Sequence, residues 1–570
     1  MADDGGKGMR FREGKRIGVV VLAAALFLLL PFSGAKALKE RTLRAACPSV
    51  CGETVVSRTA RDGMILSLPG TWNLAEVVLE IDDAEEIYLG DAQTPFRRGE
   101  AGDLTGKTGT GLAIRNRDGM TLGHVTILQG SRLPALFLTV DADELKAAGR
   151  DKDRRIDRGH ACWLETDGSV GYDGEITQLK GRGNNTFRYM KKPWQVKLAE
   201  KAPLGGMEAA KTWVLLANWC DISLLRNQIV MDVSRAAGLR NALECRQADV
   251  WINGAYQGLY LVSEKIQVGK ERIPITNLEK ATEKAEGWTE DPGKLVKGGT
   301  KELPLTRSYP AVPDPEDITG GYIATIEKTH RLRDYLLAGF RTEEGLSVQI
   351  KEPTNPSPAQ TEYLGGVVRR IHRALMAGDG RDPETGKAFS ELLDTESFAL
   401  RALTEEWCKN YDLLGGSQFF YKDSDAADPR VYAGPAWDYD LSFGNMKDRG
   451  YSPEAPYIAQ FPKNGNLYWL LEKHADFTDL EGKLWRERFR PALAVLLGER
   501  EEMPGESLCP LDAYYAQIAD SAAMNTARWG VNSAATGPYS GESFDHAFSY
   551  LKNWITKRTA WMDAHFGTGE

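Results

Sequence analysis

The sequence predicts an α+β fold, with strands in its first half and a helical region towards its C-terminus. Apolar and polar residues alternate in 194–198, and this period of two is typical of strands. Residues 64–68 and 77–81 are short, mainly apolar runs that also predict strands. Later, apolar residues recur at helical spacing, as in 358–375 and 396–408. A chain of 570 residues exceeds one ordinary core, so we expect two or three units.

The composition is that of a folded globular protein, with 42% hydrophobic and 26% charged residues. The net charge of −9 argues against nucleic acid or an anionic membrane surface as the main partner. Seven cysteines in this length do not form a disulfide scaffold, and no spacing of Cys and His suggests zinc.

The N-terminus carries a membrane-targeting segment. Basic residues between Met9 and Arg16 precede nineteen uncharged residues at 17–35. Small residues at 33–37 resemble a cleavage site, whereas the length also suffices for a transmembrane anchor with its basic flank inside. Either fate, release or anchoring, places the rest of the chain outside the cytoplasm. We therefore assign residues 1–37 to a basic stub and the membrane-targeting segment, separate from the folded part of the chain.

Three further units are expected after the targeting segment. Residues 38–130 form a small β-rich module without recognisable chemistry, which we interpret as a spacer or interaction domain. Residues 131–450 form a mixed core, in which the charged, Pro- and Gly-rich stretch 269–320 is a long loop or insertion. Residues 451–570 are mainly helical.

Residues 180–198, KGRGNNTFRYMKKPWQVKL, join a glycine-bearing polar loop to an alternating strand. The apolar residues of the strand face one way, and Gln195 and Lys197 the other. A loop rich in backbone N–H groups, followed by a strand that directs a lysine, suits the binding of polyphosphate. The same letters also fit an ordinary hairpin with a solvated lysine face.

A helix and a hairpin follow. Asp221 or Ser223 is expected to cap the helix, and Gly238 to end it. Asn253-Gly254 predicts a two-residue hairpin turn, and Glu264 lies at the exit of this hairpin.

Acidic residues follow in two places that suit a metal-dependent reaction. Asp412 lies between a predicted helix and a predicted strand. Asp438 and Asp440 are separated by one residue at the end of a strand predicted over 431–440, so their carboxylates point to one side and suit a divalent cation. The alternatives are structural, namely a turn at Asp412 and a hairpin end at the acidic pair.

This order of parts is the order found in protein kinases, although neither HRD nor DFG is present. The sequence resembles the CotH kinase family, the spore coat protein H type of atypical protein kinase, from about Pro134 to Asn445. The matching stretches are KGRGNNTFRYMKKPWQVKL, WVLLANWCDISLLRNQIVMDVSRAAGL, VWINGAYQGLYLVSEKI, TGGYIATIEK, EEWCKNYDLLGGSQFFYKD and GPAWDYDLSFGN.

The resemblance implies a two-lobed, atypical protein-kinase-like domain that binds ATP with Mg²⁺ or Mn²⁺ and phosphorylates serine or threonine of a cell-surface or coat protein. It makes Asp412 the catalytic base, and Asp438 and Asp440 the metal ligands. The cofactor-binding candidates are Arg182, Asn184, Thr186, Lys192 or Lys197, Asn218, Arg226 and Glu264, with Asp221 beside them.

One position departs from the kinase pattern. Kinases place a metal-binding Asn five residues after the catalytic Asp, whereas this chain has Ser417, followed by Gln418. The alternative function is therefore a catalytically weak or inactive surface protein that keeps the same fold. Whether the protein is active or inactive, we expect two partners: a protein of the cell surface or coat, and the membrane, which the N-terminal segment contacts. We do not expect nucleic acid as a partner.

Overall fold

The computed structural model describes residues 41–567 except 49, 51, 290–294, 300–303, 311, 329–337, 343–344, 448–449, 463–465, 504–505 and 532–541. The predicted targeting segment at 17–35 lies outside the described residues. Among the helices that the structure describes, none is both long enough and apolar enough to cross a bilayer. Residues from Leu43 onward belong to one compact unit, and the contacts below lie within it.

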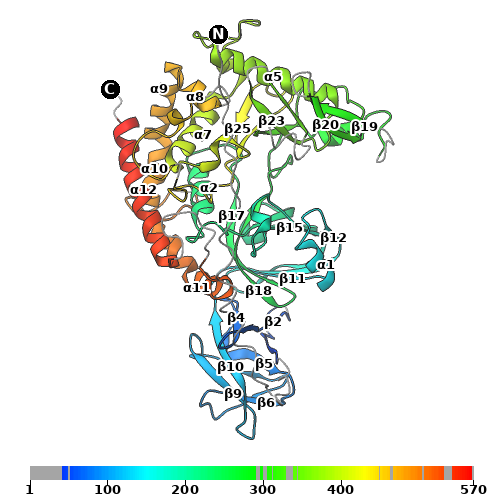
Figure 1. Ribbon diagram of the computed structural model, residues 1–570, viewed down its shortest axis with the longest axis vertical. Helices are drawn as coiled ribbons and strands as arrows, with labels where there is room; N and C mark the ends of the chain where they lie inside the picture. The colour runs from blue at the N-terminus through cyan, green and yellow to red at the C-terminus, as the bar shows by residue number, and fades with distance from the viewer. Residues whose placement is uncertain are drawn as a thin grey trace, which may run out of the picture. The chain divides into compact units, whose positions relative to one another are not determined.

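Seven strands close into a barrel at the centre of this unit (Figure 1). Each strand pairs with the next around the barrel, and the first pairs again with the last, in the order β16 (Ala210–Leu216), β15 (Trp194–Ala202), β14 (Val170–Gly181), β13 (Gly159–Leu164), β11 (Ala135–Thr139), β17 (Cys245–Ile252) and β18 (Ala255–Glu264). All seven strands contribute residues to one apolar cluster, including Leu179, Val196, Trp213 and Val250. The alternation seen in the sequence therefore fills the inside of the barrel.

The predicted hairpin is confirmed as β17–β18. Its two turn residues, Asn253 and Gly254, have φ values of 50° and 74°. Two successive positive φ values define the turn that matches the twist of paired strands, and Asn-Gly accepts them with least strain.

The N-terminal β module extends the sheet beyond β18. Strands β2 (Thr54–Val56), β1 (Leu43–Ala46), β5 (Val77–Ile81) and β8 (Ala101–Gly102) follow β18 in that order. A six-stranded sheet accompanies them, ordered β3 (Arg58–Ala60), β4 (Gly63–Leu68), β10 (Thr121–Gln129), β9 (Gly111–Arg115), β6 (Glu86–Leu89) and β7 (Phe96–Arg97). The β-rich character predicted for residues 38–130 is confirmed for their described part.

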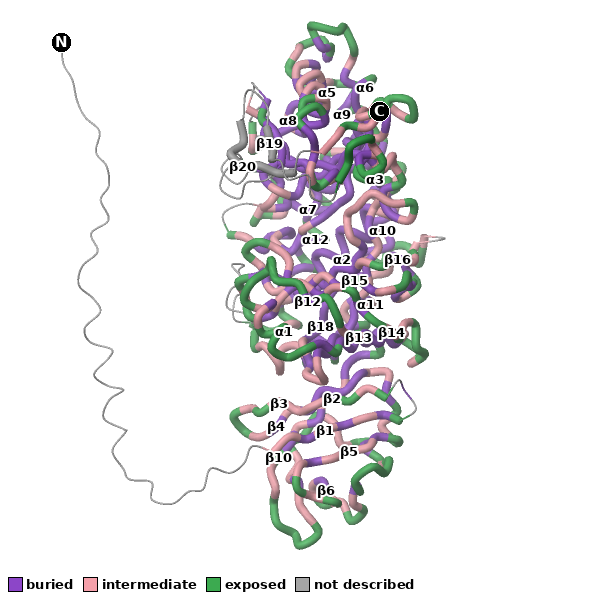
Figure 2. Tube along the Cα trace, turned by 90° about the vertical axis from the view of Figure 1, so that its right-hand side faces the viewer, coloured by how far each residue is buried: buried purple, intermediate pink, exposed green. Residues whose placement is uncertain are grey.

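A second sheet and most of the helices form the remaining part of the unit. The five-stranded sheet has the order β22 (Gly339–Arg341), β23 (Ser347–Glu352), β21 (Tyr322–Ile326), β24 (Gln418–Lys422) and β25 (Val431–Ala433). The helices of this part include α2 (Arg226–Ala236), α5 (Pro358–Met376), α7 (Thr395–Cys408), α8 (Leu467–Leu471), α9 (Ala475–Leu484), α10 (Arg490–Leu496) and α12 (Phe544–Phe566). Helix α11 (Leu511–Trp529) packs instead against β18 of the barrel. Helix α7 is buried along almost its whole length (Figure 2).

Three predicted helices are confirmed with small shifts of their ends. Helices α5 and α7 cover the predicted ranges 358–375 and 396–408. Helix α2 begins at Arg226, whose backbone N–H donates to the Asp221 carboxylate at 2.9 Å, and Gly238 with φ of 91° follows its end. An Asp before the first turn and a glycine after the last are the expected helix boundaries.

Two predicted segments differ from the structure. The strand predicted over 431–440 was too long, because β25 ends at Ala433. Gly434 follows with φ of 113°, and Pro435 has no N–H to continue the ladder. The insertion at 269–320 is not irregular throughout, since it contains α3 (Leu278–Glu283) and the paired strands β19 (Leu295–Gly299) and β20 (Pro304–Pro310).

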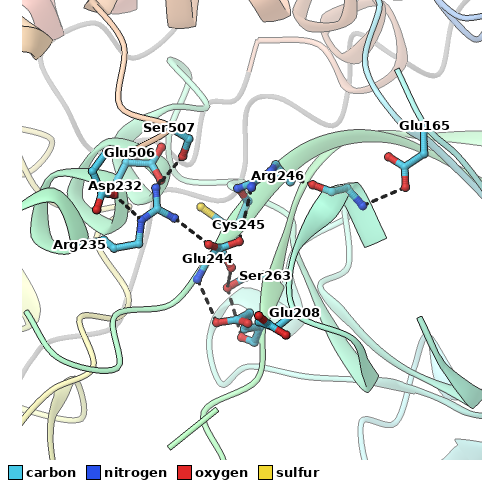
Figure 3. A network of polar contacts seen from close by, with 12 residues as sticks. Glu165, Glu208, Asp232, Arg235, Glu244, Cys245, Arg246, Ser263, Glu506 and Ser507 are labelled. Atoms are coloured by element: carbon cyan, nitrogen blue, oxygen red, sulfur yellow. Dashed lines mark hydrogen bonds and ion pairs between the residues drawn. The ribbon is translucent and has the colours of Figure 1, made fainter. Parts of the chain in front are cut away.

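A polar network joins the barrel to helix α2 and to the chain that precedes α11 (Figure 3). Its centre is Arg235, which lies 3.5 Å from carboxylate oxygens of both Asp232 and Glu244 and 3.1 Å from Glu506. Arg246 of β17 lies 3.4 Å from Glu244. Segments far apart in the sequence are therefore held together by shared carboxylates on the same side of the barrel.

Candidate functional site

Four aspartates gather where helix α2, the turn after α7 and the segment after β25 meet. Asp440 is almost fully buried, with an exposed fraction of 7%. Burial, followed by the negative charges of Asp438, Asp412 and Asp221, raises the pKa of Asp440 well above its ordinary range, and Arg226 opposes this. The structure therefore brings together the predicted base and both predicted metal ligands.

The segment that carries Asp438 and Asp440 is fixed through its backbone. The backbone N–H of Tyr439 donates to Asn227 Oδ1 at 2.7 Å, and the Asn227 amide donates to Asn218 Oδ1 at 3.0 Å. The Asn445 amide donates to the carbonyls of Asp440 at 2.5 Å and Cys220 at 2.8 Å. Asn218 thus acts here through Asn227, as a positioning residue for the acidic segment.

Arg226 makes an internal ion pair. Its Nη1 lies 2.5 Å from Asp221 Oδ1, and its Nε donates to the carbonyl of Ser442 at 2.9 Å. The side chains of both members of the pair are 0% exposed. The structure therefore places Arg226, a predicted cofactor-binding residue, in an ion pair that ties the start of α2 to the acidic segment.

Asp412 lies in a short 3₁₀ turn, Tyr411–Leu414, between α7 and β24. Its backbone N–H donates to Asn410 Oδ1 at 3.1 Å, so the preceding asparagine caps this turn. The position between helix and strand agrees with the sequence prediction. Its carboxylate is half-buried and acts on Asp440 electrostatically.

Ser417 and Gln418, which replace the kinase asparagine, take different partners. The Ser417 hydroxyl donates to Asp438 Oδ2 at 3.4 Å. The Gln418 amide donates instead to the carbonyl of Leu413. Ser417 therefore contacts a candidate metal ligand, whereas the Gln418 amide closes the turn that carries Asp412.

Cationic side chains gather beside the predicted phosphate loop. Burial, followed by the positive charges of Arg155, Lys265 and Arg182, lowers the pKa of Lys180 at the end of β14. Arg182 lies over the ring of Trp437, 5.0 Å from its centroid, and burial lowers its pKa to about 10 while Asp438 opposes the change. Arg182 thus connects the cationic cluster to the acidic one.

The loop itself is compact. The backbone N–H of Arg182 donates to the carbonyl of Pro193 at 3.1 Å, which closes the loop. A side chain at Gly183, where φ is 84°, would lie 2.2 Å from Thr186 Oγ1, so the close packing of Thr186 requires glycine there. Thr186 begins a 3₁₀ turn, whereas Asn184 is exposed.

The two predicted lysines lie apart from these clusters. Lys192 donates to the carbonyl of Phe187 at 2.7 Å and lies over the ring of the same residue. Lys197 is exposed on β15, on the outside of the barrel. Lys180 and Gln195 are paired across β14 and β15, and Lys180 is the lysine on this surface that is half-buried among other cations.

Glu264, at the end of β18, pairs with Arg272 and accepts the backbone N–H of Glu244 at 3.0 Å. Glu244 also belongs to the polar network of Figure 3. Glu264 therefore fixes the chain where it leaves the barrel, and the structure does not bring it to the four aspartates.

An apolar cluster fills the seam between the barrel and the five-stranded sheet. It contains Val214 from the barrel, Met231 from α2, Ile323 and Phe419 from the sheet, and Trp437. Partly buried side chains pack against it, including Leu216 at the end of β16, and Ile266 and Val268 after β18. This seam leads from the exit of β18 to Trp437, where the cationic and acidic clusters meet.

The donors present suit a hard divalent cation. Mg²⁺ in nucleotide sites is held by one or two carboxylates, with phosphate and water completing its shell. Within the described ranges, no three His, Cys, Asp or Glu side chains converge as a complete metal site. Buried Asp440 nevertheless lies beside three further carboxylates, with Arg226 as the opposing cation, and Asp438 with Asp440 would hold the divalent cation.

Sequence reasoning missed Lys180, Lys265 and Asn227. Lys180 had a signal, because the alternation of β14 places it on the same side as Gln195 of the neighbouring strand. Lys265 and Asn227 had none, since their roles depend on contacts between segments far apart in the sequence.

Comparison with known proteins finds a matching family model. The family described as "CotH kinase protein" matches residues 179–562, which span the cationic loop, the four aspartates and the helices that follow. None of the curated proteins compared with the chain matches it. The family match covers most of the chain, and this protein therefore belongs to the CotH kinase family.

Proposed function

We propose that this protein is a kinase that transfers the γ-phosphate of ATP to serine or threonine of another protein outside the cytoplasm. The observation that carries the proposal is the contact region around Trp437. There, Arg182 of the cationic cluster reaches Asp438 of the acidic cluster. Phosphoryl transfer needs both charges, one to hold phosphates and one to hold a metal and accept a proton.

Each group has a defined task in this proposal. The adenine packs against the edge of the apolar seam, on the partly buried side chains of Ile266 and Val268 after β18. Lys180, Arg182 and Lys265 offset the charge of the phosphates. Asp412 accepts the proton of the attacking hydroxyl group. A bound divalent cation would supply further neutralisation of the phosphate charge, held by Asp438 and Asp440.

Three further residues hold the acidic segment in a fixed position. Arg226 and Asn227 hold the acidic segment from α2, and Ser417 contacts Asp438 from the other side. Because little covalent chemistry is required of the protein, orientation and charge account for most of the rate in such sites. The fixed backbone of the acidic segment supports this function.

The proposed substrate is a protein of the cell surface or spore coat. Family membership supports a surface or coat location, and the sequence of residues 17–35 predicts export by cleavage or anchoring. The alternative is a surface protein without turnover, which the replacement of the kinase asparagine by Ser417 favours.

One experiment separates the two. The full chain is incubated with ATP, Mg²⁺ or Mn²⁺, and a mixture of surface proteins, and phosphorylated residues are identified by mass spectrometry. We expect phosphoserine or phosphothreonine that depends on metal and is lost with Asp412→Asn. ATP-dependent thermal stabilisation without any transferred phosphate would instead establish the inactive, nucleotide-binding form.

A further inference from the structure

A cavity lies between the N-terminal β module and the barrel, with a volume of about 200 Å³. Its walls come from both parts, namely the segment around β2 to β4, the start of β18, and the end of α11. The lining residues are Val56, Ser57, Arg58, Ile65, Ser67, Ala255, Tyr256 and Arg528. None of them belongs to the acidic or cationic cluster described above, and those from β2 to β4 precede the matched family region.

Two arginines face this cavity and are held in place by backbone carbonyls. Arg58 donates from Nη2 to the carbonyl of Ala527 at 2.7 Å. Arg528 donates from Nε to the carbonyl of Tyr256 at 3.0 Å and lies over the ring of Trp529. These contacts fix both guanidinium groups on the same cavity while leaving other N–H donors of each group for a ligand.

The two guanidinium groups repel each other. Burial, followed by the positive charge of Arg58, lowers the pKa of Arg528. In the part of the chain that the structure describes, neither arginine forms an ion pair with a carboxylate. Holding two like charges together on one cavity costs free energy, which a bound anion would recover.

A hydroxyl group beside the arginines adds a donor. The oxygen of Ser57 accepts the backbone N–H of Leu43 at 3.0 Å, so its own proton can point to a ligand. The Tyr256 hydroxyl, in contrast, donates to Asp249 at 2.6 Å. Two guanidinium forks with one hydroxyl form a set of donors that matches the oxygens of a tetrahedral phosphate.

We propose that this cavity is a binding site for a phosphate group, free or carried by a small organic molecule. The volume is several times that of one water molecule, which leaves room beside the phosphate for a few carbon atoms. The ligand contacts the β module through Arg58 and Ser57, and the kinase-like part through Arg528. It therefore stabilises the junction between them.

The direct test measures, by calorimetry at constant ionic strength, whether inorganic phosphate and glycerol 3-phosphate bind to the full chain. At least one of the two is expected to bind, and Arg58→Gln or Arg528→Gln to weaken it about tenfold or more. Arg182→Gln is the matched control, because it removes an arginine of the ATP site and leaves this cavity intact. Binding that survives both cavity variants, or that only Arg182→Gln weakens, overturns the proposal.

A second variant does not depend on removing an arginine. Ser57→Asp places a carboxylate on the cavity that both guanidinium groups line, so it is expected to raise the melting temperature in phosphate-free buffer and to abolish the stabilisation by phosphate. The proposal is contradicted if phosphate binds Ser57→Asp as tightly as it binds the wild type. It is also contradicted if the wild type binds neither ligand at about 10 mM. Binding of glycerol 3-phosphate alone shows that the organic group contributes.

Discussion

Replacing Arg226 by methionine should destabilise the protein by about 3–5 kcal/mol. Methionine keeps much of the length and the apolar contacts of the arginine stem, but it removes the charge. Arg226 is fully buried, with Nη1 at 2.5 Å from Asp221 and at 2.9 Å from the Ser223 hydroxyl, and with Nε at 2.9 Å from the carbonyl of Ser442. Its loss leaves the Asp221 carboxylate buried beside Asp440 without the cation that opposes their negative charge.

The magnitude follows from what remains in the variant rather than from the strength of the pair. An uncompensated buried charge costs about 3–5 kcal/mol, whereas exposed ion pairs contribute about 0–1 kcal/mol. The double variant Arg226→Met with Asp221→Asn should therefore cost less than the sum of its single changes. We expect a coupling of about 1–3 kcal/mol between the two positions.

The assay is urea unfolding followed by tryptophan fluorescence, since Trp407 and Trp437 report on the parts that this pair joins. Arg486→Met is the matched control, because Arg486 is exposed and its replacement should change the free energy of unfolding by no more than about 0.5 kcal/mol. A loss below about 1 kcal/mol in Arg226→Met, or additive effects in the double variant, would refute the reasoning.

Three further predictions concern nucleotide, metal and pH. Lys180→Gln should weaken ATP binding about tenfold in a fluorescence titration, whereas Lys197→Gln on the exposed side of β15 should change it less than about twofold; equal effects would contradict the placement of the cationic cluster. Ser417→Ala should weaken Mn²⁺ binding in the presence of ATP about tenfold, measured by electron paramagnetic resonance, because Ser417 orients Asp438; unchanged affinity would remove that role. Burial and the charge of Glu406 raise the pKa of Glu472 to about 8. The folded state therefore keeps a proton on Glu472 that the unfolded state releases near pH 4.5. The free energy of unfolding consequently falls as the pH rises between these two values. Glu472→Gln should gain in melting temperature over the wild type from pH 5 to pH 8, and a constant difference would show that this carboxyl does not titrate there.

Much of the fold could be predicted because its strands and helices follow local patterns. The Asn253-Gly254 turn specifies its hairpin through two positive φ values, and the helical spacing in 358–375 reappears as α5. Closure of the barrel could not be predicted in this way. It depends on the pairing of β16 with β18, whose partners lie about fifty residues apart, as between Leu216 and Leu261.

Part of the candidate site could likewise be predicted from the sequence, and part could not. Asp412, Asp438 and Asp440 could be proposed from their spacing and order, and the structure brings them together. The choice among the lysines could not be made, because Lys180 and Lys197 lie on neighbouring strands and differ in burial rather than in sequence pattern. Burial among Arg155, Lys265 and Arg182 is a property of the closed fold.

The central claim is that Asp412 accepts a proton during phosphate transfer to a protein hydroxyl. The most direct measurement is the rate at which the γ-phosphate of labelled ATP appears on a protein serine or threonine, compared between the wild type and Asp412→Asn at saturating ATP and metal. The account predicts transfer by the wild type and a fall of about 100-fold or more in the variant. Equal rates in the two proteins, or no transfer by either, would contradict it.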